Sequence, residues 1–61
     1  MTPEKFTSEE EAVKRARVLA KLHSYVCVID SGGKFYVENE SAMVRIWERV
    51  VVRFENGKED R

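Results

Sequence analysis

The 61-residue sequence has few of the residues that hold small domains together through disulfides or metal ions. It contains one cysteine, Cys27, which cannot form a disulfide within the chain, and one histidine, His23. These two side chains fall short of the four ligands of a structural zinc site, so we expect no metal and no cofactor. Small domains without such supports often gain stability by oligomerisation, and we therefore expect a homodimer.

Long hydrophobic runs are also missing from the sequence. The longest uninterrupted apolar run, Tyr25 to Ile29, is far shorter than the about 20 residues that a membrane-spanning helix needs. The first residues, Met1 to Lys5, lack the apolar segment of a signal peptide. The sequence therefore predicts a cytoplasmic protein with no membrane partner.

The sequence carries no excess of charge of either sign. Its 11 lysine and arginine residues balance its 11 aspartate and glutamate residues, which gives a net charge of zero. Nucleic-acid-binding proteins usually carry a basic excess, because they neutralise phosphates. Nucleic acid is therefore the less favoured partner.

The length of the chain limits what it can hold. We expect residues 1–61 to form a single small domain, with polar ends at residues 1–5 and 56–61 that fray. A chain of this size has little volume for a ligand pocket of several hundred Å³, so we expect no small-molecule substrate.

The segment after Phe6 has the features of an amphipathic helix. Thr7 or Ser8 is a suitable N-cap, with Glu10 or Glu11 three residues later as the partner of a capping box. The acidic residues 9–11 also lie near the positive end of the helix dipole. Helical spacing places Ala12, Val13, Ala16, Leu19, Ala20 and His23 on one apolar face, with Leu22 at its edge. The opposite face carries Lys14, Arg17 and Lys21, with Arg15 to one side.

The middle of the chain has the pattern of a β-hairpin. Two runs of β-branched and aromatic residues, Tyr25 to Ile29 and Lys34 to Glu38, flank the sequence Asp30-Ser31-Gly32-Gly33. A two-residue turn at the glycines would pair Val28 with Val37. One sheet face then carries Val26, Val28, Phe35 and Val37, and the other carries Tyr25, Cys27, Ile29 and Tyr36.

The last third of the chain fits two periodicities. Met43, Trp47, Val50, Val51 and Phe54 have helical spacing, whereas Val50, Val52 and Phe54 alternate as in a strand. The run of valines before the Asn56-Gly57 turn favours a strand, preceded by a short helical turn from Ser41 to Trp47.

We therefore predict an α+β fold in which one N-terminal amphipathic helix packs on a small antiparallel sheet. The order of elements is α-β-β-β, and α-β-β-α stays open as the alternative. This order resembles that of many small bacterial or phage-borne domains, a resemblance of pattern that implies no activity.

The sequence predicts one apolar surface beyond the core. A single helix covers one face of a sheet, and this hairpin has apolar residues on both of its faces. Monomeric proteins rarely expose such a patch, which more often meets a partner. We interpret the following residues as a protein interface: Tyr25, Cys27, Ile29, Tyr36, Trp47 and Val51.

No catalytic motif stands out in the sequence. Cys27 and His23 are a nucleophile and a base, but four residues of extended chain between them span about 13 Å. The loop from Ser31 to Lys34 joins two predicted strands, whereas a phosphate-binding loop leads from a strand into a helix. We therefore expect no catalytic residues and a non-enzymatic protein.

The leading functional hypothesis is a small interaction module, a homodimer that presents a sheet or helix surface to a protein partner. The alternative is a small nucleic-acid-binding regulator. It would contact nucleic acid through the basic helix residues Lys14, Arg15, Arg17 and Lys21.

Overall fold

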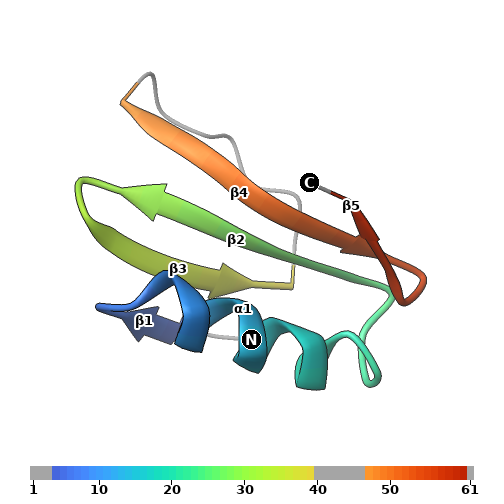
Figure 1. The fold of residues 1–61 in the computed structure, drawn as a ribbon. Coiled ribbons are helices and arrows are strands. Elements are labelled where there is room, and N and C mark those ends of the chain that lie inside the picture. The colour runs from blue at the N-terminus through green and yellow to red at the C-terminus, as the bar shows by residue number, and fades with distance from the viewer. Residues whose placement is uncertain (1–3, 40–46, 61) are drawn as a thin grey trace.

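The computed structural model describes residues 4–39 and 47–60. Its elements are β1 (Glu4–Phe6), α1 (Glu9–Leu19), β2 (Tyr25–Ser31), β3 (Lys34–Glu38), β4 (Glu48–Glu55) and β5 (Lys58–Asp60). The five strands form one antiparallel sheet in the order β1-β3-β2-β4-β5 (Figure 1). The described residues therefore form a mixed α+β fold that is mostly sheet, and the predicted order of a helix followed by strands is present within it.

The start of α1 agrees with the sequence prediction. Ser8 is the N-cap residue and has an extended backbone, with φ −121° and ψ 130°, and its carbonyl accepts a hydrogen bond from the Ala12 N–H. The Ser8 side chain forms no capping hydrogen bond. The predicted capping box is therefore not formed, and the acidic residues 9–11 remain as the favourable interaction with the helix dipole.

The hairpin between β2 and β3 has the predicted turn and register. Gly32 and Gly33 have positive φ angles of 61° and 88°, which side-chain-bearing residues rarely adopt. Val28 pairs with Val37, as the two-residue turn requires. The Asp30 side chain supports the turn, because its Oδ1 accepts a hydrogen bond from the Gly33 N–H at 3.3 Å.

The segment with two possible periodicities forms a strand. β4 pairs with β2 along its length, which confirms the predicted third strand and excludes a helix over Glu48–Glu55. The pairing contains a register shift. Val28 pairs with Val52 and the next residue, Ile29, pairs with Val50, so β4 has one extra residue, Val51, at this point. The helical turn predicted from Ser41 lies outside the described residues.

Both ends of the described chain form edge strands, which the sequence prediction missed. We expected residues 1–5 and 56–61 to fray, but Glu4–Phe6 pairs with β3 and Lys58–Asp60 pairs with β4. The second pairing follows a tight turn in which Asn56 and Gly57 have positive φ angles of 52° and 82°. Such short polar strands bury few side chains and form because a neighbouring strand accepts their backbone hydrogen bonds.

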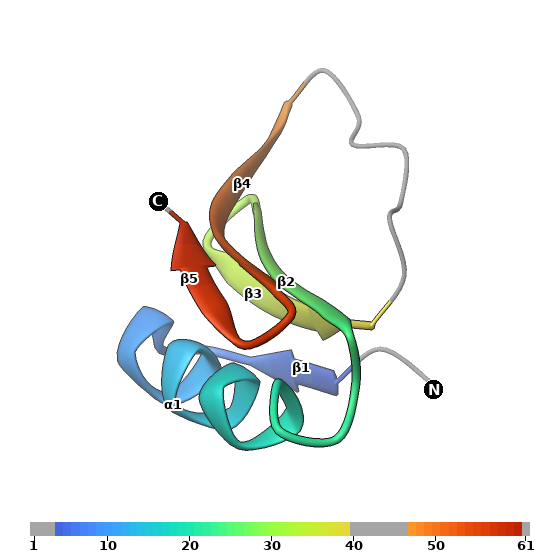
Figure 2. The same ribbon diagram turned by 90° about the vertical axis from the view of Figure 1, so that its right-hand side faces the viewer.

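The hydrophobic core lies between α1 and one face of the sheet. Figure 2 shows α1 on one side of the twisted sheet. Ala12 and Ala16 are completely buried, and their small side chains let the helix approach the strands closely. The rest of the core cluster comprises Val13, Leu19, Val26, Val28, Val37, Val52 and Phe54. The predicted inner face of the helix is therefore confirmed for these helical residues.

Candidate protein-interaction surfaces

The sheet face away from α1 holds most of the predicted interface, but part of it is already covered. Cys27 and Ile29 are only 2% and 5% exposed in the single chain. Tyr25 and Tyr36 are half-buried on the same face, where Ile29 pairs with Tyr36. The area that these residues offer to a partner is therefore smaller than the sequence suggested.

The other two predicted interface residues lie elsewhere. Val51 packs against the core cluster on the α1 side, so its placement on the opposite face was wrong. The register shift in β4 explains the error, because an extra residue in one strand breaks the alternation of side chains. Trp47 precedes β4 and is 63% exposed.

The environment of Cys27 does not favour a nucleophile. Burial raises the pKa of the Cys27 thiol, and the hydrogen bond with Tyr25 offsets this effect in part. His23 lies beyond the end of α1, where its Nδ1 is 3.3 Å from Asn39 Nδ2. The thiol is therefore kept in its protonated form. The imidazole contacts Asn39, the residue after β3, and not the thiol.

The basic helix residues divide into paired and unpaired groups. Arg15 donates to Glu4 of β1 through Nε at 3.0 Å and Nη2 at 3.2 Å, and Arg17 Nε donates to Glu59 Oε1 of β5 at 3.1 Å. Lys14 and Lys21, by contrast, form no ion pair with any described residue. Two of the four predicted nucleic-acid contacts are therefore already used within the chain.

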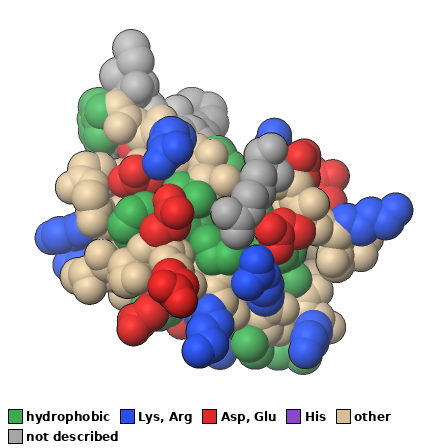
Figure 3. All heavy atoms as spheres, viewed as in Figure 1, with side chains coloured by type: hydrophobic (Ala, Val, Ile, Leu, Met, Phe, Trp, Pro, Cys, Tyr) green, Lys and Arg blue, Asp and Glu red, His purple; other side chains and the backbone are tan. Residues whose placement is uncertain are grey.

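The outward surface of α1, which we define as Lys14, Val18, Lys21 and Leu22, is the second candidate. Val18 and Leu22 are 48% and 75% exposed; Val18 lies in the last turn of α1, and Lys21 and Leu22 lie in the turn that directly follows it. Lys14 lies one turn before Val18, beside an open hollow of about 330 Å³ lined by Glu11, Lys14, Arg15 and Val18. Figure 3 shows basic side chains and a small apolar patch along the lower edge of the molecule, where α1 lies in that view.

The sequence reasoning found the lysines of this surface but missed its apolar residues. Val18 lies two positions after Ala16, which places it almost opposite the buried face on a helix of 3.6 residues per turn. A valine among the charged residues of the outer helix face was the sequence signal for an exposed apolar residue there. Leu22 follows α1 in a turn, so helical spacing placed it wrongly at the edge of the buried face.

A further hollow lies between α1 and the β4–β5 hairpin. It measures about 320 Å³ and is lined by Arg17, Ala20, Lys21, Phe54, Gly57 and Glu59. The Arg17–Glu59 ion pair spans it, and Phe54 at its base is only 3% exposed. Two of its charged lining residues, Arg17 and Glu59, already pair with each other, so this hollow is a weak candidate for a ligand site.

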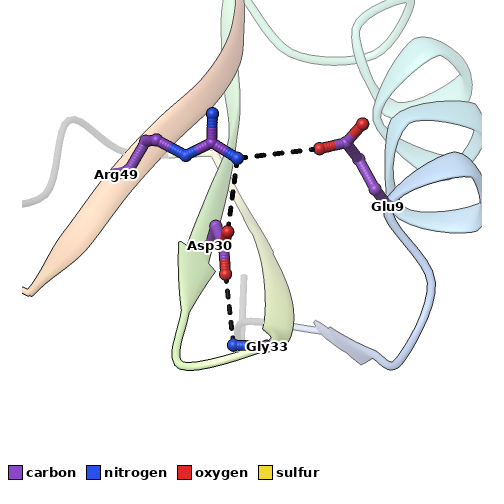
Figure 4. Close-up of polar contacts among 4 residues, drawn as sticks. All are labelled: Glu9, Asp30, Gly33 and Arg49. Carbon is purple, nitrogen blue, oxygen red and sulfur yellow. Dashed lines mark hydrogen bonds and ion pairs between the residues drawn. The ribbon is translucent and has the colours of Figure 1, made fainter.

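A cluster of charged residues joins three elements on the helix side of the sheet (Figure 4). Arg49 Nη2 lies 3.3 Å from Asp30 Oδ2 and 4.0 Å from Glu9 Oε1. The arginine therefore faces both carboxylates, and the other oxygen of Asp30 is engaged in the turn. This arrangement links β4, the end of β2 and the start of α1, and Arg49 offsets the negative charge of both carboxylates.

Residues 4–39 and 47–60 contain no cluster of three histidine, cysteine or acidic side chains that could hold a metal ion. In the same part of the chain, no helix has the length and apolar character needed to cross a membrane.

Comparison with known proteins adds no family to these observations. A scan against protein-family models, a search of curated proteins and a search of solved structures each find no match to this chain. The geometry of the described residues is therefore the basis for a functional proposal.

Proposed function

We propose that the protein is a non-enzymatic interaction module that binds another protein through the outward surface of α1. The observation that carries this proposal is the exposure of Val18 and Leu22, 48% and 75%, on the side of the helix away from the core. Neighbouring exposed apolar residues rimmed by charged residues are one mark of a surface that meets a partner. We also propose a cytoplasmic location, because a reducing compartment suits the single buried thiol of Cys27.

The helix surface is preferred over the sheet surface because of burial. Cys27 and Ile29, the centre of the predicted sheet interface, have almost no exposed area left to lose on binding. Leu22 is 75% exposed, so a partner that covers it would remove more apolar area from water than one that covers Cys27 or Ile29.

The nucleic-acid alternative is less well supported. Glu4 and Glu59 already engage Arg15 and Arg17, so a nucleic acid would have to compete with these ion pairs. Lys14 and Lys21 alone would neutralise about two phosphates, a small contribution for a chain of zero net charge.

Site-specific photo-crosslinking in the cells that express the protein tests the helix surface. A photoreactive residue at position 22 should give a discrete adduct with another protein, whereas the same residue at position 34, an exposed position in the β2–β3 hairpin, should not. The adduct from position 22 should disappear when Val18→Ser is added. Equal labelling from both positions, or no adduct from position 22, would contradict the proposal.

The homodimer is a separate proposal that uses what remains of the sheet surface. Tyr25 and Tyr36 are half-buried and Trp47 is exposed, so two copies meeting there would cover aromatic surface. Light scattering over a dilution series should give twice the 7.1 kDa mass of the chain. Tyr36→Asp should restore the monomer mass, because it would place a carboxylate in the interface. If the unmodified protein has the monomer mass at every concentration, the dimer proposal is contradicted. The proposal for the outward surface of α1 would still stand.

A further inference from the structure

We infer that the partner of the outward surface of α1 is an acidic amphipathic helix. Its apolar side chains would contact Val18 and Leu22, and its carboxylates would face Lys14 and Lys21. This inference rests on the proposed function and adds the chemistry of the partner.

The charges around the apolar pair carry the argument. Lys14 lies four residues before Val18 and Lys21 lies three residues after it, so one ammonium group stands on each side of the apolar centre along the helix axis. Neither lysine has a carboxylate partner among the described residues, whereas the neighbouring arginines are both paired. Unused positive charge is therefore concentrated around the exposed apolar residues.

The spacing of the lysines defines the spacing of the complementary acids. Lys14 lies in α1 and Lys21 lies in the turn that continues it, where the Lys21 N–H donates to the Val18 carbonyl, so the two residues are about 10 Å apart along the helix direction. A partner helix with carboxylates seven residues apart and leucines between them would match both lysines and both apolar residues. Charge complementarity of this kind improves specificity and the rate of association.

One acidic residue restricts where the partner can lie. Glu11 lines the hollow beside Lys14 and Val18, one turn nearer the start of α1. A carboxylate of the partner placed over Glu11 would be repelled, so the acidic side chains should gather from Lys14 toward the end of the helix.

The same surface fits nucleic acid and membranes less well. Phosphates would leave Val18 and Leu22 without an apolar partner, although these residues have the most exposed apolar area on α1. Stable binding to a lipid surface requires a broad apolar face, and the broad apolar face of α1 is already buried in the core.

An NMR titration of the isotopically labelled protein tests the inference. The probe is a synthetic helical peptide of about 16 residues, with leucines along one face and glutamates seven residues apart on both sides of them. A second peptide has lysine in place of each glutamate. We expect shift changes confined to α1 and the turn that follows it, residues 9–22, with the acidic peptide. Binding should be at least about fourfold weaker with the basic peptide, because exchanging each glutamate for lysine turns two exposed attractive pairs into repulsive ones.

Matched variants keep the charge change constant. Lys14→Glu combined with Lys21→Glu should weaken binding of the acidic peptide by at least about fourfold, because both attractive pairs become repulsive. Lys5→Glu combined with Lys34→Glu alters the net charge equally at exposed positions, one opposite Tyr36 on the sheet face away from α1 and one in the β2–β3 hairpin, and should leave the affinity within about twofold. All four lysines are exposed, so both variants should fold.

Three results would overturn the inference. They are equal binding of both peptides, shift changes centred outside residues 9–22, and tighter binding to a short DNA duplex or to anionic phosphatidylglycerol vesicles than to the acidic peptide. Because the peptide charge is tested on the unmodified protein, a variant that fails to fold leaves the test intact. If position 22 still crosslinks to a protein while the acidic peptide does not bind, the proposed function holds and the acidic partner is wrong.

Discussion

Val28→Ala should remove a large part of the stability of this protein. Val28 is completely buried on the central strand β2, where it pairs with Val37 on one side and Val52 on the other. The substitution deletes two carbon atoms, each contributing about 0.8 kcal/mol of transfer free energy, and leaves a cavity between two neighbouring strands. We expect the free energy of unfolding to fall by about 2 to 3 kcal/mol.

That loss is large relative to the total. A chain of 61 residues should have a free energy of unfolding of about 3 to 9 kcal/mol. The melting temperature should therefore fall by about 10 to 20 °C, which circular dichroism during heating would detect, and urea unfolding at constant temperature would give the free energy directly.

Val18→Ala is the matched control, because it deletes the same atoms from a residue that is 48% exposed on α1. Alanine also favours a helix, so the free energy of unfolding should change by less than about 0.5 kcal/mol in either direction. Equal losses from both substitutions, or a loss of under about 0.5 kcal/mol from Val28→Ala, would refute the assignment of β2 as the buried central strand.

Three further predictions concern the helix, the turn and the alkaline limit of stability. Ala16→Glu should lower the free energy of unfolding by about 3 kcal/mol or more, since Ala16 is completely buried and an unpaired carboxylate there would be desolvated; a melting temperature within a few degrees of the original would contradict this. Gly33→Ala should lower the free energy of unfolding by about 1 kcal/mol through its φ of 88° alone, because no atom lies within 4 Å of the added carbon. D-alanine at the same position, introduced by chemical synthesis, should restore the urea midpoint because it favours positive φ. Burial raises the pKa of Cys27 and of Tyr25 in the folded protein, so stability should be complete below the ordinary cysteine pKa of 9.0 and decline as the pH rises above it. Urea midpoints measured from about pH 8 to about pH 11 should show this decline, and Cys27→Ala should reduce it; a flat profile would count against burial of both groups.

Local sequence signals determined the main elements of the fold. The acidic residues after Ser8 and the helical spacing from Ala12 to Leu19 specified where α1 starts and which face it buries. Two adjacent glycines specified the β2–β3 turn and its register, because a two-residue turn with positive φ angles leaves one way to pair the flanking strands. These features depend on residues close together in the chain, so the sequence alone is sufficient to predict them.

Other features of the sheet were decided by contacts between distant residues. β1 and β5 are three residues each and mostly polar, and they become strands only because β3 and β4 lie beside them. The register shift opposite Ile29 moved Val51 to the core side, which strict alternation along the strand does not predict.

For the candidate binding surface, too, the sequence determined one part and the tertiary structure the other. The sequence determined that three basic residues of α1 and Lys21 just after it lie away from the buried face, since that follows from helical spacing. The tertiary structure decided which of them a partner can use. Glu4 and Glu59 are 11 and 42 residues away from Arg15 and Arg17 in the chain, and the sheet brings these carboxylates to the helix. Lys14 and Lys21, near Val18 and Leu22, form no ion pair with any described residue, and Glu59, the acid of β5 that reaches this side of the helix, pairs with Arg17.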